Sequence, residues 1–128
     1  MDTNKKSIAI TATIILILLA LGMWLVIKAV NVPGKYDKLA QCLKDKGATF
    51  YGAFWCPHCQ KEKSWFGSST KYLPYVECSN PDGHTQTQVC IDKKITGYPT
   101  WIFTDGSQLT GEVPLDQLAQ KTSCEMPK

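Results

Sequence analysis

The chain is short, weakly basic and rich in cysteine. Its 128 residues leave room for one ordinary domain, and its formal charge of +3 arises from fourteen lysines without any arginine. The lysines occur in runs of at most two, which disfavours nucleic-acid binding, because nucleic-acid-binding proteins concentrate basic residues on one face. The six cysteines favour an oxidising compartment and disulfides that stabilise a domain with a small core.

The first thirty residues predict a membrane-spanning helix. Ser7 to Ile27 form a run of 21 residues without a charge. As a helix this run would extend about 31 Å, close to the thickness of about 30 Å of the hydrocarbon core of a bilayer. A cleaved signal peptide is the alternative, but its apolar region is usually about 7 to 15 residues long. We expect a retained transmembrane anchor over residues 7–30, after a cytoplasmic N-terminus over residues 1–6.

The cysteines indicate the orientation of this helix better than the lysines do. Lysines lie on both sides of the apolar run, so the positive-inside rule does not decide between the two orientations. Disulfides persist outside the cytoplasm. We therefore expect a single-pass membrane protein whose C-terminal domain is extracytoplasmic, in a periplasm or a lumen.

After a linker over residues 31–35, residues 36–128 are predicted to form an α/β domain. The strand expected over 48–55 is a continuous apolar and aromatic run, typical of a strand buried on both faces. Asp105 and Gly106 are typical of a hairpin turn. The predicted elements are a helix over 36–46, a strand over 48–55, a helix over 58–66, a strand over 74–78, a helix over 85–94, a hairpin of strands over 100–103 and 107–110, and a helix after Pro114.

The segment Trp55-Cys56-Pro57-His58-Cys59 is the candidate redox site. A Cys-x-x-Cys pair alone also occurs in zinc and iron–sulfur sites. Here the pair follows a buried strand and begins a helix, where unpaired N–H groups and the helix dipole favour a nucleophilic thiolate at Cys56. His58 adds a hydrogen bond or positive charge that stabilises this thiolate, so we expect a lowered Cys56 pKa. Cys59, one turn further, would be the resolving thiol that attacks a mixed disulfide at Cys56.

Three motifs together resemble the thioredoxin superfamily across nearly all of residues 36–124. They are WCPHC after an aromatic strand, GYPT before another strand, and Gly111-Glu112 before a leucine-containing helix. More narrowly, FYGAFWCPHCQKEK, YVECS and GYPTW are similar to the thioredoxin-like domain of bacterial and plant vitamin K epoxide reductase homologues. The resemblance implies a thioredoxin-like fold, in which helices flank a central mixed sheet.

The resemblance also implies roles for single residues. It carries Cys56 and Cys59 over as the redox pair and Pro99 as a cis proline that packs against them. Tyr98 and Trp55 would then contact an extended substrate, although Trp55 is equally suited to filling the core. Ordinary thioredoxins carry a buried acidic residue six positions before the first cysteine, where this chain has Phe50, so the proton of Cys59 needs another route.

The expected partner also follows from the resemblance. In the homologous fusions, the thioredoxin-like domain exchanges disulfides with a membrane-embedded reductase domain that passes electrons to a quinone. This chain has one hydrophobic span, so we expect a separate membrane oxidase of the vitamin K epoxide reductase type, with protein thiols as substrates. His58 favours the oxidising direction, because a lower nucleophile pKa makes the disulfide more oxidising. The alternatives are an extracytoplasmic thiol reductase and a non-catalytic binding module stapled by disulfides.

The remaining cysteines are expected to form structural disulfides. The resemblance suggests a Cys78–Cys90 bridge, which would contribute up to about 3 kcal/mol as a staple or would relay electrons from the redox pair. Cys42 and Cys124 are then left as a second pair. A zinc site of four cysteines is disfavoured, because a zinc ribbon has no use for the histidine and proline motifs. We expect neither a metal nor a cofactor.

Overall fold

The structure is a computed structural model that describes residues 2–30 and 32–128. The chain divides into two units, Met1–Val32 and Pro33–Lys128, and each is described by itself. Met1, the first residue of the predicted cytoplasmic segment, and Asn31, the first residue of the predicted linker, lie outside the described residues.

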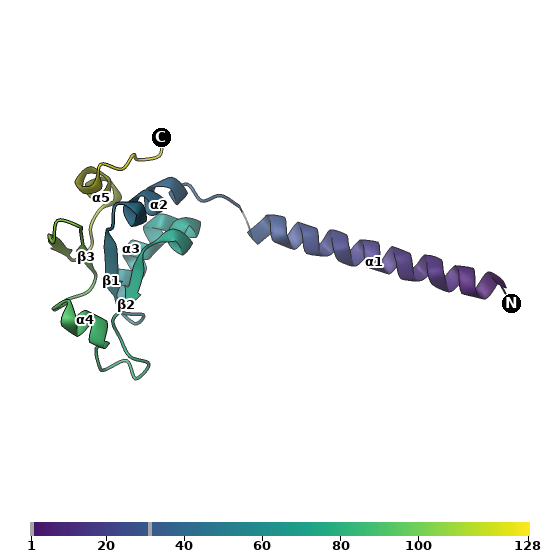
Figure 1. The fold of residues 1–128 in the computed structure, drawn as a ribbon, viewed down its shortest axis with the longest axis horizontal. Helices are drawn as coiled ribbons and strands as arrows, with labels where there is room; N and C mark the ends of the chain where they lie inside the picture. The colour runs from purple at the N-terminus through teal and green to yellow at the C-terminus, as the bar shows by residue number, and fades with distance from the viewer. Residues whose placement is uncertain (1, 31) are drawn as a thin grey trace. The chain divides into compact units, whose positions relative to one another are not determined.

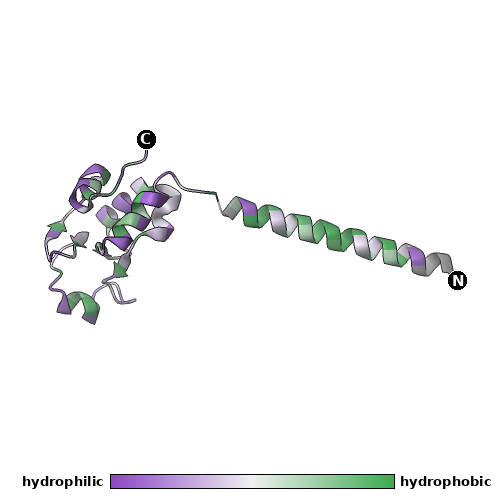
Figure 2. Cartoon of the chain, turned by 45° about the horizontal axis from the view of Figure 1, so that its top comes forward, coloured by the Kyte–Doolittle hydropathy of each residue, from purple (hydrophilic) through white to green (hydrophobic). Residues whose placement is uncertain are grey.

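The first unit is one long apolar helix, α1, which extends from Asp2 to Val30 (Figure 1). Hydropathy colouring shows that most of its length is hydrophobic (Figure 2). By length and composition, Lys6–Ala29 is the one helical stretch among the described residues that is suited to crossing a membrane. A signal sequence near an N-terminus meets the same criteria, so the retained anchor stays a prediction.

The second unit is built on a four-stranded mixed sheet in the order β2-β1-β3-β4. The central strand β1 pairs in parallel with β2 and antiparallel with β3, and β4 pairs antiparallel with β3 at the edge. The strands are β1 (Thr49–Gly52), β2 (Tyr75–Glu77), β3 (Thr100–Ile102) and β4 (Gln108–Thr110). The helices are α2 (Asp37–Asp45), α3 (Pro57–Phe66), the 3-10 helix η1 (Gly67–Tyr72), α4 (Gln88–Asp92) and α5 (Leu115–Thr122).

Two hydrophobic clusters cover the opposite faces of β1. Consecutive residues of a strand point to opposite faces, and Phe50 lies in the larger cluster whereas Tyr51 lies in the smaller one. The larger cluster holds residues of α2, α3, β3 and α5, including Leu39, Phe66, Trp101 and Leu118. The smaller cluster contains Cys78, Cys90 and Ile95. The central strand is thus buried on both faces, as its apolar sequence predicts.

Two predicted elements are about twice as long as the observed ones. The predicted strand over 48–55 ends at Gly52, and Phe54 and Trp55 are about half exposed because the chain leaves the sheet there to begin α3. The predicted helix over 85–94 is reduced to α4 at Gln88–Asp92. Residues before α4 pair with the segment after β2 instead, through an isolated bridge between Ser79 and Gln86 and further backbone hydrogen bonds. The backbone N–H and C=O groups before α4 are thus already paired and do not form the hydrogen bonds of a longer helix.

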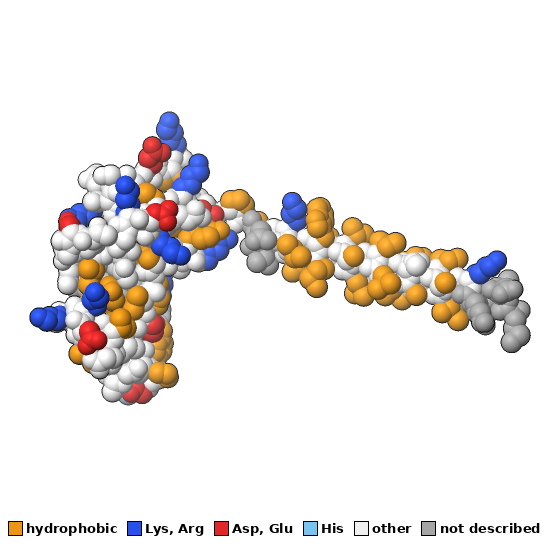
Figure 3. Space-filling view, in the orientation of Figure 1, with side chains coloured by type: hydrophobic (Ala, Val, Ile, Leu, Met, Phe, Trp, Pro, Cys, Tyr) orange, Lys and Arg blue, Asp and Glu red, His pale blue; other side chains and the backbone are white. Residues whose placement is uncertain are grey.

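The charged residues of the domain are dispersed. On the face shown in Figure 3, lysine side chains lie among acidic and uncharged side chains without forming a continuous basic surface.

Candidate redox site

The two free cysteines lie at the start of α3. Cys56 is the N-cap residue, with an extended backbone, and its Sγ accepts a hydrogen bond of 3.4 Å from the backbone N–H of Cys59. Pro57 occupies the first position of the helix, where its missing N–H has no intrahelical partner to lose. Cys56 is 4% exposed and Cys59 is fully buried. Thiol chemistry at this site therefore begins at Cys56, the sulfur nearer to solvent.

The loop before β3 packs against Cys56. The Tyr98–Pro99 peptide bond is cis, and the Cys56 thiol donates to the Tyr98 carbonyl oxygen at 3.8 Å. The ring of Trp55 meets the ring of Tyr98 edge to face, with centroids 6.0 Å apart. The Trp55 indole N–H also donates to Ser79 Oγ at 2.9 Å. The half-exposed Trp55 is therefore part of the rim around Cys56 rather than of the core.

His58 bonds to Glu112 and not to Cys56, the thiolate that it is predicted to stabilise. Its Nδ1 lies 2.6 Å from Glu112 Oε1, and Lys61 Nζ lies 2.8 Å from the other oxygen of the same carboxylate. Hydrogen bonds from Lys61 and His58 lower the Glu112 pKa. Among the described residues, no hydrogen bond joins His58 to Cys56. Stabilisation of the thiolate by His58 thus stays a prediction, and Glu112, to which sequence reasoning gave no role, controls the position of the imidazole.

Cys59 is held as a neutral thiol. Burial raises its pKa to about 12, with further increases from the hydrogen bond and the negative charge of Cys56. A backbone hydrogen bond at Ala53 and, to a smaller extent, the Lys63 charge oppose this rise. A thiol of this kind does not ionise appreciably at neutral pH. In disulfide exchange, however, Cys59 must react as a thiolate, so its ionisation is the difficult part of the resolving step.

A second buried titratable group on α3, Glu62, was missed by sequence reasoning. Its side chain is fully buried, and the Trp101 indole N–H donates to its Oε1 at 2.7 Å. Burial raises the Glu62 pKa to about 7. The charged segment QKEK is typical of a solvated helix surface, but Cys59, Glu62 and Phe66 follow one another at helical spacing and share the buried face. That spacing is the signal that could have revealed Glu62.

The other four cysteines form two disulfides. Cys42 of α2 is bonded to Cys124, which follows α5, and their Cα atoms are 6.0 Å apart. Cys78, directly after β2, is bonded to Cys90 of α4, with a Cα separation of 5.5 Å. Both separations are ordinary for disulfides. In the part of the chain that the structure describes, no group of three or more His, Cys, Asp or Glu side chains is arranged to hold a metal ion.

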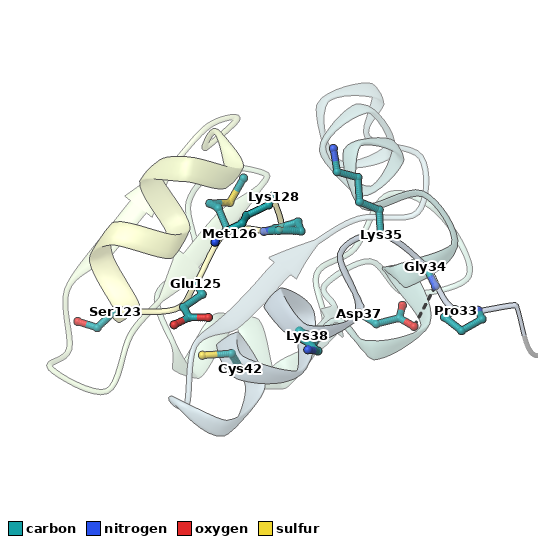
Figure 4. Close-up of a pocket in the computed structure, with 11 residues that line it drawn as sticks. Pro33, Gly34, Lys35, Asp37, Lys38, Cys42, Ser123, Glu125, Met126 and Lys128 are labelled. Atoms are coloured by element: carbon teal, nitrogen blue, oxygen red, sulfur yellow. Dashed lines mark hydrogen bonds between the residues drawn. The ribbon is translucent and has the colours of Figure 1, made fainter.

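A surface pocket lies apart from the redox cysteines. It has a volume of about 830 Å³ and lies between residues 33–42 and the C-terminal residues 123–128 (Figure 4). Asp37, at its edge, accepts a hydrogen bond of 2.9 Å from the Gly34 backbone N–H. The only cysteine that lines it, Cys42, is already bonded to Cys124. The pocket therefore contains no group for thiol chemistry.

A reduced Cys-x-x-Cys pair at a helix N-terminus, a cis proline beside it and a mixed sheet behind both define a thioredoxin-like dithiol domain. The chain belongs to the thioredoxin family: the family described as Thioredoxin matches residues 32–123. Its predicted fold class and family are thereby confirmed.

Two curated relatives support the same class. The chain is 46% identical over 89 residues to the thiol-disulfide oxidoreductase LTO1 of Arabidopsis thaliana, a match that covers 66% of this chain and 23% of that protein. It is 35% identical over 72 residues to the thioredoxin domain-containing protein 5 homolog of Drosophila melanogaster, covering 49% of this chain and 16% of that protein. The chain thus spans less than a quarter of the length of these relatives. The predicted enzyme class, a protein thiol-disulfide oxidoreductase, agrees with the first of them.

Proposed function

We propose that the chain is a membrane-anchored thiol-disulfide oxidoreductase that exchanges disulfides between the Cys56–Cys59 pair and protein thiols outside the cytoplasm. The observation that carries this proposal is the free dithiol at the N-terminus of α3, with the Tyr98 carbonyl 3.8 Å from Cys56 Sγ. The other four cysteines are bonded in pairs and are not available for exchange. The similarity to the Arabidopsis thiol-disulfide oxidoreductase LTO1 supports the same chemistry.

The exchange proceeds through a mixed disulfide at Cys56. In the oxidising direction, a substrate thiolate attacks Cys56 Sγ of the Cys56–Cys59 disulfide, and Cys59 leaves as a thiolate that takes up a proton. A second substrate thiolate then attacks the substrate sulfur of the mixed disulfide, and Cys56 leaves. The substrate gains a disulfide, and its two electrons remain on Cys56 and Cys59. In the reducing direction the same steps run in reverse.

The rim around Cys56 suits an extended polypeptide substrate. Pro99 and Tyr98 present a backbone carbonyl beside the nucleophile, and that carbonyl can accept a hydrogen bond from a substrate N–H when the Cys56 thiol no longer donates to it. Trp55 offers a half-exposed aromatic surface next to it. Backbone contacts of this kind bind many sequences, which fits an enzyme that acts on protein thiols in general.

The location follows from α1 and the disulfides. α1 has the length and composition of a single transmembrane span, and the two disulfides suit an oxidising compartment. We place residues 1–6 in the cytoplasm, the anchor over residues 7–30, and the thioredoxin-like domain over residues 36–128 in a periplasm or a lumen. The resemblance to thioredoxin-like domains of vitamin K epoxide reductase homologues supports a quinone-linked membrane oxidase as the protein that reoxidises Cys56 and Cys59.

Trapping of the mixed disulfide tests this function. Cys59→Ala removes the resolving thiol, so we expect cells that carry the full-length variant to accumulate proteins disulfide-linked to Cys56, including a polytopic membrane protein. The matched control is the double variant Cys56→Ala, Cys59→Ala, which keeps both structural disulfides and lacks the nucleophile. Non-reducing gels and mass spectrometry identify the linked proteins. Equal recovery from the single and the double variant, or no linked protein from either, would contradict the proposal.

The direction of exchange is a separate question, which a redox titration of the Cys56–Cys59 couple answers. The hydrogen bond between His58 and Glu112 favours the alternative of a reductase, because the imidazole is held by Glu112 and does not bond to Cys56 to stabilise its thiolate. The predicted oxidase requires a potential well above that of thioredoxin. A value as low as about −270 mV would identify a reductase instead.

A further inference from the structure

Cys59 exchanges a proton in each catalytic cycle, in whichever direction the enzyme works. It is fully buried, and the position that sequence reasoning singled out as lacking an acid, Phe50, is packed in the core between the rings of Tyr75 and Trp101. Phe50 can neither compensate charge nor accept a proton. A backbone hydrogen bond at Ala53 lowers the Cys59 pKa, and any further compensation has to come from other side chains.

Three polar residues lie on the side of Cys59 that faces β2. Lys63 follows Cys59 by four residues on α3, a spacing that places both side chains on the same helix face. Lys63 Nζ lies 3.1 Å from the centroid of the Tyr75 ring, and the Tyr75 hydroxyl donates to Glu77 Oε2 at 2.7 Å. We call Lys63, Tyr75 and Glu77 the β2 cluster.

Gly52 brings the β2 cluster close to the sulfur. A Cβ atom on Gly52 would lie 3.0 Å from Cys59 Sγ and 3.0 Å from Tyr75 Cε2, so the sulfur and the ring edge approach β1 at the same point. Contacts of this length are tighter than most contacts that real Cβ atoms make, so a neighbouring atom would have to shift by a few tenths of an ångström. The absence of a side chain at Gly52 therefore lets Cys59 and Tyr75 approach β1 without strain.

Glu77 is fixed in position by three donors. Besides the Tyr75 hydroxyl, the backbone N–H groups of Phe54 and Ser79 donate to its Oε1 at 3.1 and 2.9 Å. A carboxylate held in this way is a rigid negative charge. Burial lowers the Lys63 pKa. The negative charges of Glu77 and Cys59 oppose this decrease, so both favour a charged Lys63.

The remaining titratable groups near Cys59 are less suited to this role. Tyr75 stays a hydroxyl, because burial, the bond to Glu77 and nearby negative charges raise its pKa. Cys56 carries the mixed disulfide when Cys59 reacts. Glu62 lies on the same helix but binds Trp101, and its pKa responds to burial, Trp101, Val113 and Glu112 rather than to Cys59. Lys63 thus lies on the helix face of the resolving thiol, and its positive charge favours the Cys59 thiolate.

We propose that Lys63, held by Tyr75 and Glu77, is a positioning residue that stabilises Cys59 as a thiolate and so sets the rate of the resolving step. This inference rests on the proposed exchange function. The Cys59 thiol gives its proton to the thiolate released when the mixed disulfide formed, or to a solvent base. The Cys59 thiolate then attacks Cys56 Sγ, the Cys56–partner bond breaks, and the partner leaves as a thiolate with both electrons of that bond. In the opposite direction, Lys63 stabilises Cys59 as the leaving group.

A two-step thiol assay on the full chain in detergent separates the two cysteines. Reduced protein, with both structural disulfides intact by mass, is mixed with an aromatic disulfide reagent whose released thiolate absorbs visible light. Attack by Cys56 releases the first equivalent, and attack by Cys59 on the resulting mixed disulfide releases the second. We compare Lys63→Met with the wild type, with Lys63→Arg as the charge-conserving variant, and with Lys71→Met. Lys71 also lies over an aromatic ring, that of Tyr72, but on the exposed surface of η1.

The second step alone is expected to respond to the Lys63 charge. In Lys63→Met its rate at a given pH falls about tenfold or more, and its pH profile moves to higher pH by about one unit, since one unit of pKa is tenfold in thiolate. The rate of the first step stays close to that of the wild type in Lys63→Met. In Lys71→Met and in Lys63→Arg, the rate of the second step stays close to that of the wild type. The inference is overturned if Lys63→Met resolves like the wild type, if both steps slow equally, or if Lys63→Arg is as slow as Lys63→Met. A wild-type chain that releases no second equivalent would overturn the proposed function itself.

Discussion

Glu62 gives the sharpest prediction for stability, because its carboxyl is fully buried beside Trp101. Burial raises its pKa from an ordinary value of 4.5 to about 7, against the opposing effect of the Trp101 hydrogen bond. The folded state therefore binds a proton more tightly than the unfolded state does. This contribution to stability is complete below pH 4.5 and is lost as the pH rises through about 7. Since one pKa unit corresponds to about 1.4 kcal/mol, the loss amounts to about 3 kcal/mol.

Glu62→Gln isolates this effect. Glutamine retains an acceptor for the Trp101 indole N–H but does not titrate, so the variant should lack the decrease in stability between pH 4.5 and 8 that the wild type shows. The measurement is denaturant unfolding of both full-length proteins in detergent, followed by tryptophan fluorescence at several pH values. Taking the difference between the two proteins removes the contribution of all other titrating groups. Parallel pH curves for the two proteins would refute the argument, whatever their absolute offset.

Two further predictions concern the surroundings of the redox pair. Gly52→Ala places a methyl group 3.0 Å from Cys59 Sγ and from the Tyr75 ring, so we expect a loss of about 1 to 3 kcal/mol in unfolding free energy and a slower resolving step. A wild-type unfolding midpoint would contradict the close approach. Replacing Cys78 and Cys90 together by serine removes a disulfide with a sequence separation of 12. The free energy of unfolding, measured by thermal unfolding, should fall by up to about 3 kcal/mol. If that disulfide only staples the fold, exchange at Cys56 keeps its rate; a large loss of exchange in the folded variant would indicate a relay.

The parts of the site that the sequence predicts are local ones. Cys56 and Cys59 lie three positions apart at the first turn of one helix, and the strand before them and the proline at position 99 are recognisable from short segments. The run over 48–55 that contains Phe50 likewise predicts a strand with two buried faces, because no charged residue interrupts it. Features that depend on short segments of this kind can be predicted from the sequence unless tertiary contacts change the local structure.

The parts that the sequence does not predict depend on contacts between distant segments. Lys63 comes from α3, and Tyr75 and Glu77 come from β2. These residues meet because β2 pairs with β1 beside the small Gly52. Nothing in the segment QKEK distinguishes a partly buried lysine from a fully solvated one. The end of the strand at Gly52 and the short α4 are also tertiary effects, since the exit toward α3 and the bridge between Ser79 and Gln86 determine them.

The His58–Glu112 pair belongs to the same category. Glu112 is separated from His58 by 54 residues, and its carboxylate reaches the imidazole only because the segment after β4 passes beside α3. A histidine between two cysteines suggests a partner for the thiolate when the sequence is considered alone. The competing carboxylate becomes visible only once the chain is folded.

The two structural disulfides also bear on how the enzyme matures. Cys42–Cys124 joins the first helix of the domain to the segment after the last one, so it closes only when both ends of the domain have been synthesised and brought together. A newly made chain therefore needs an oxidant to close this disulfide. Its own maturation draws on the same supply of oxidising equivalents that it is proposed to distribute.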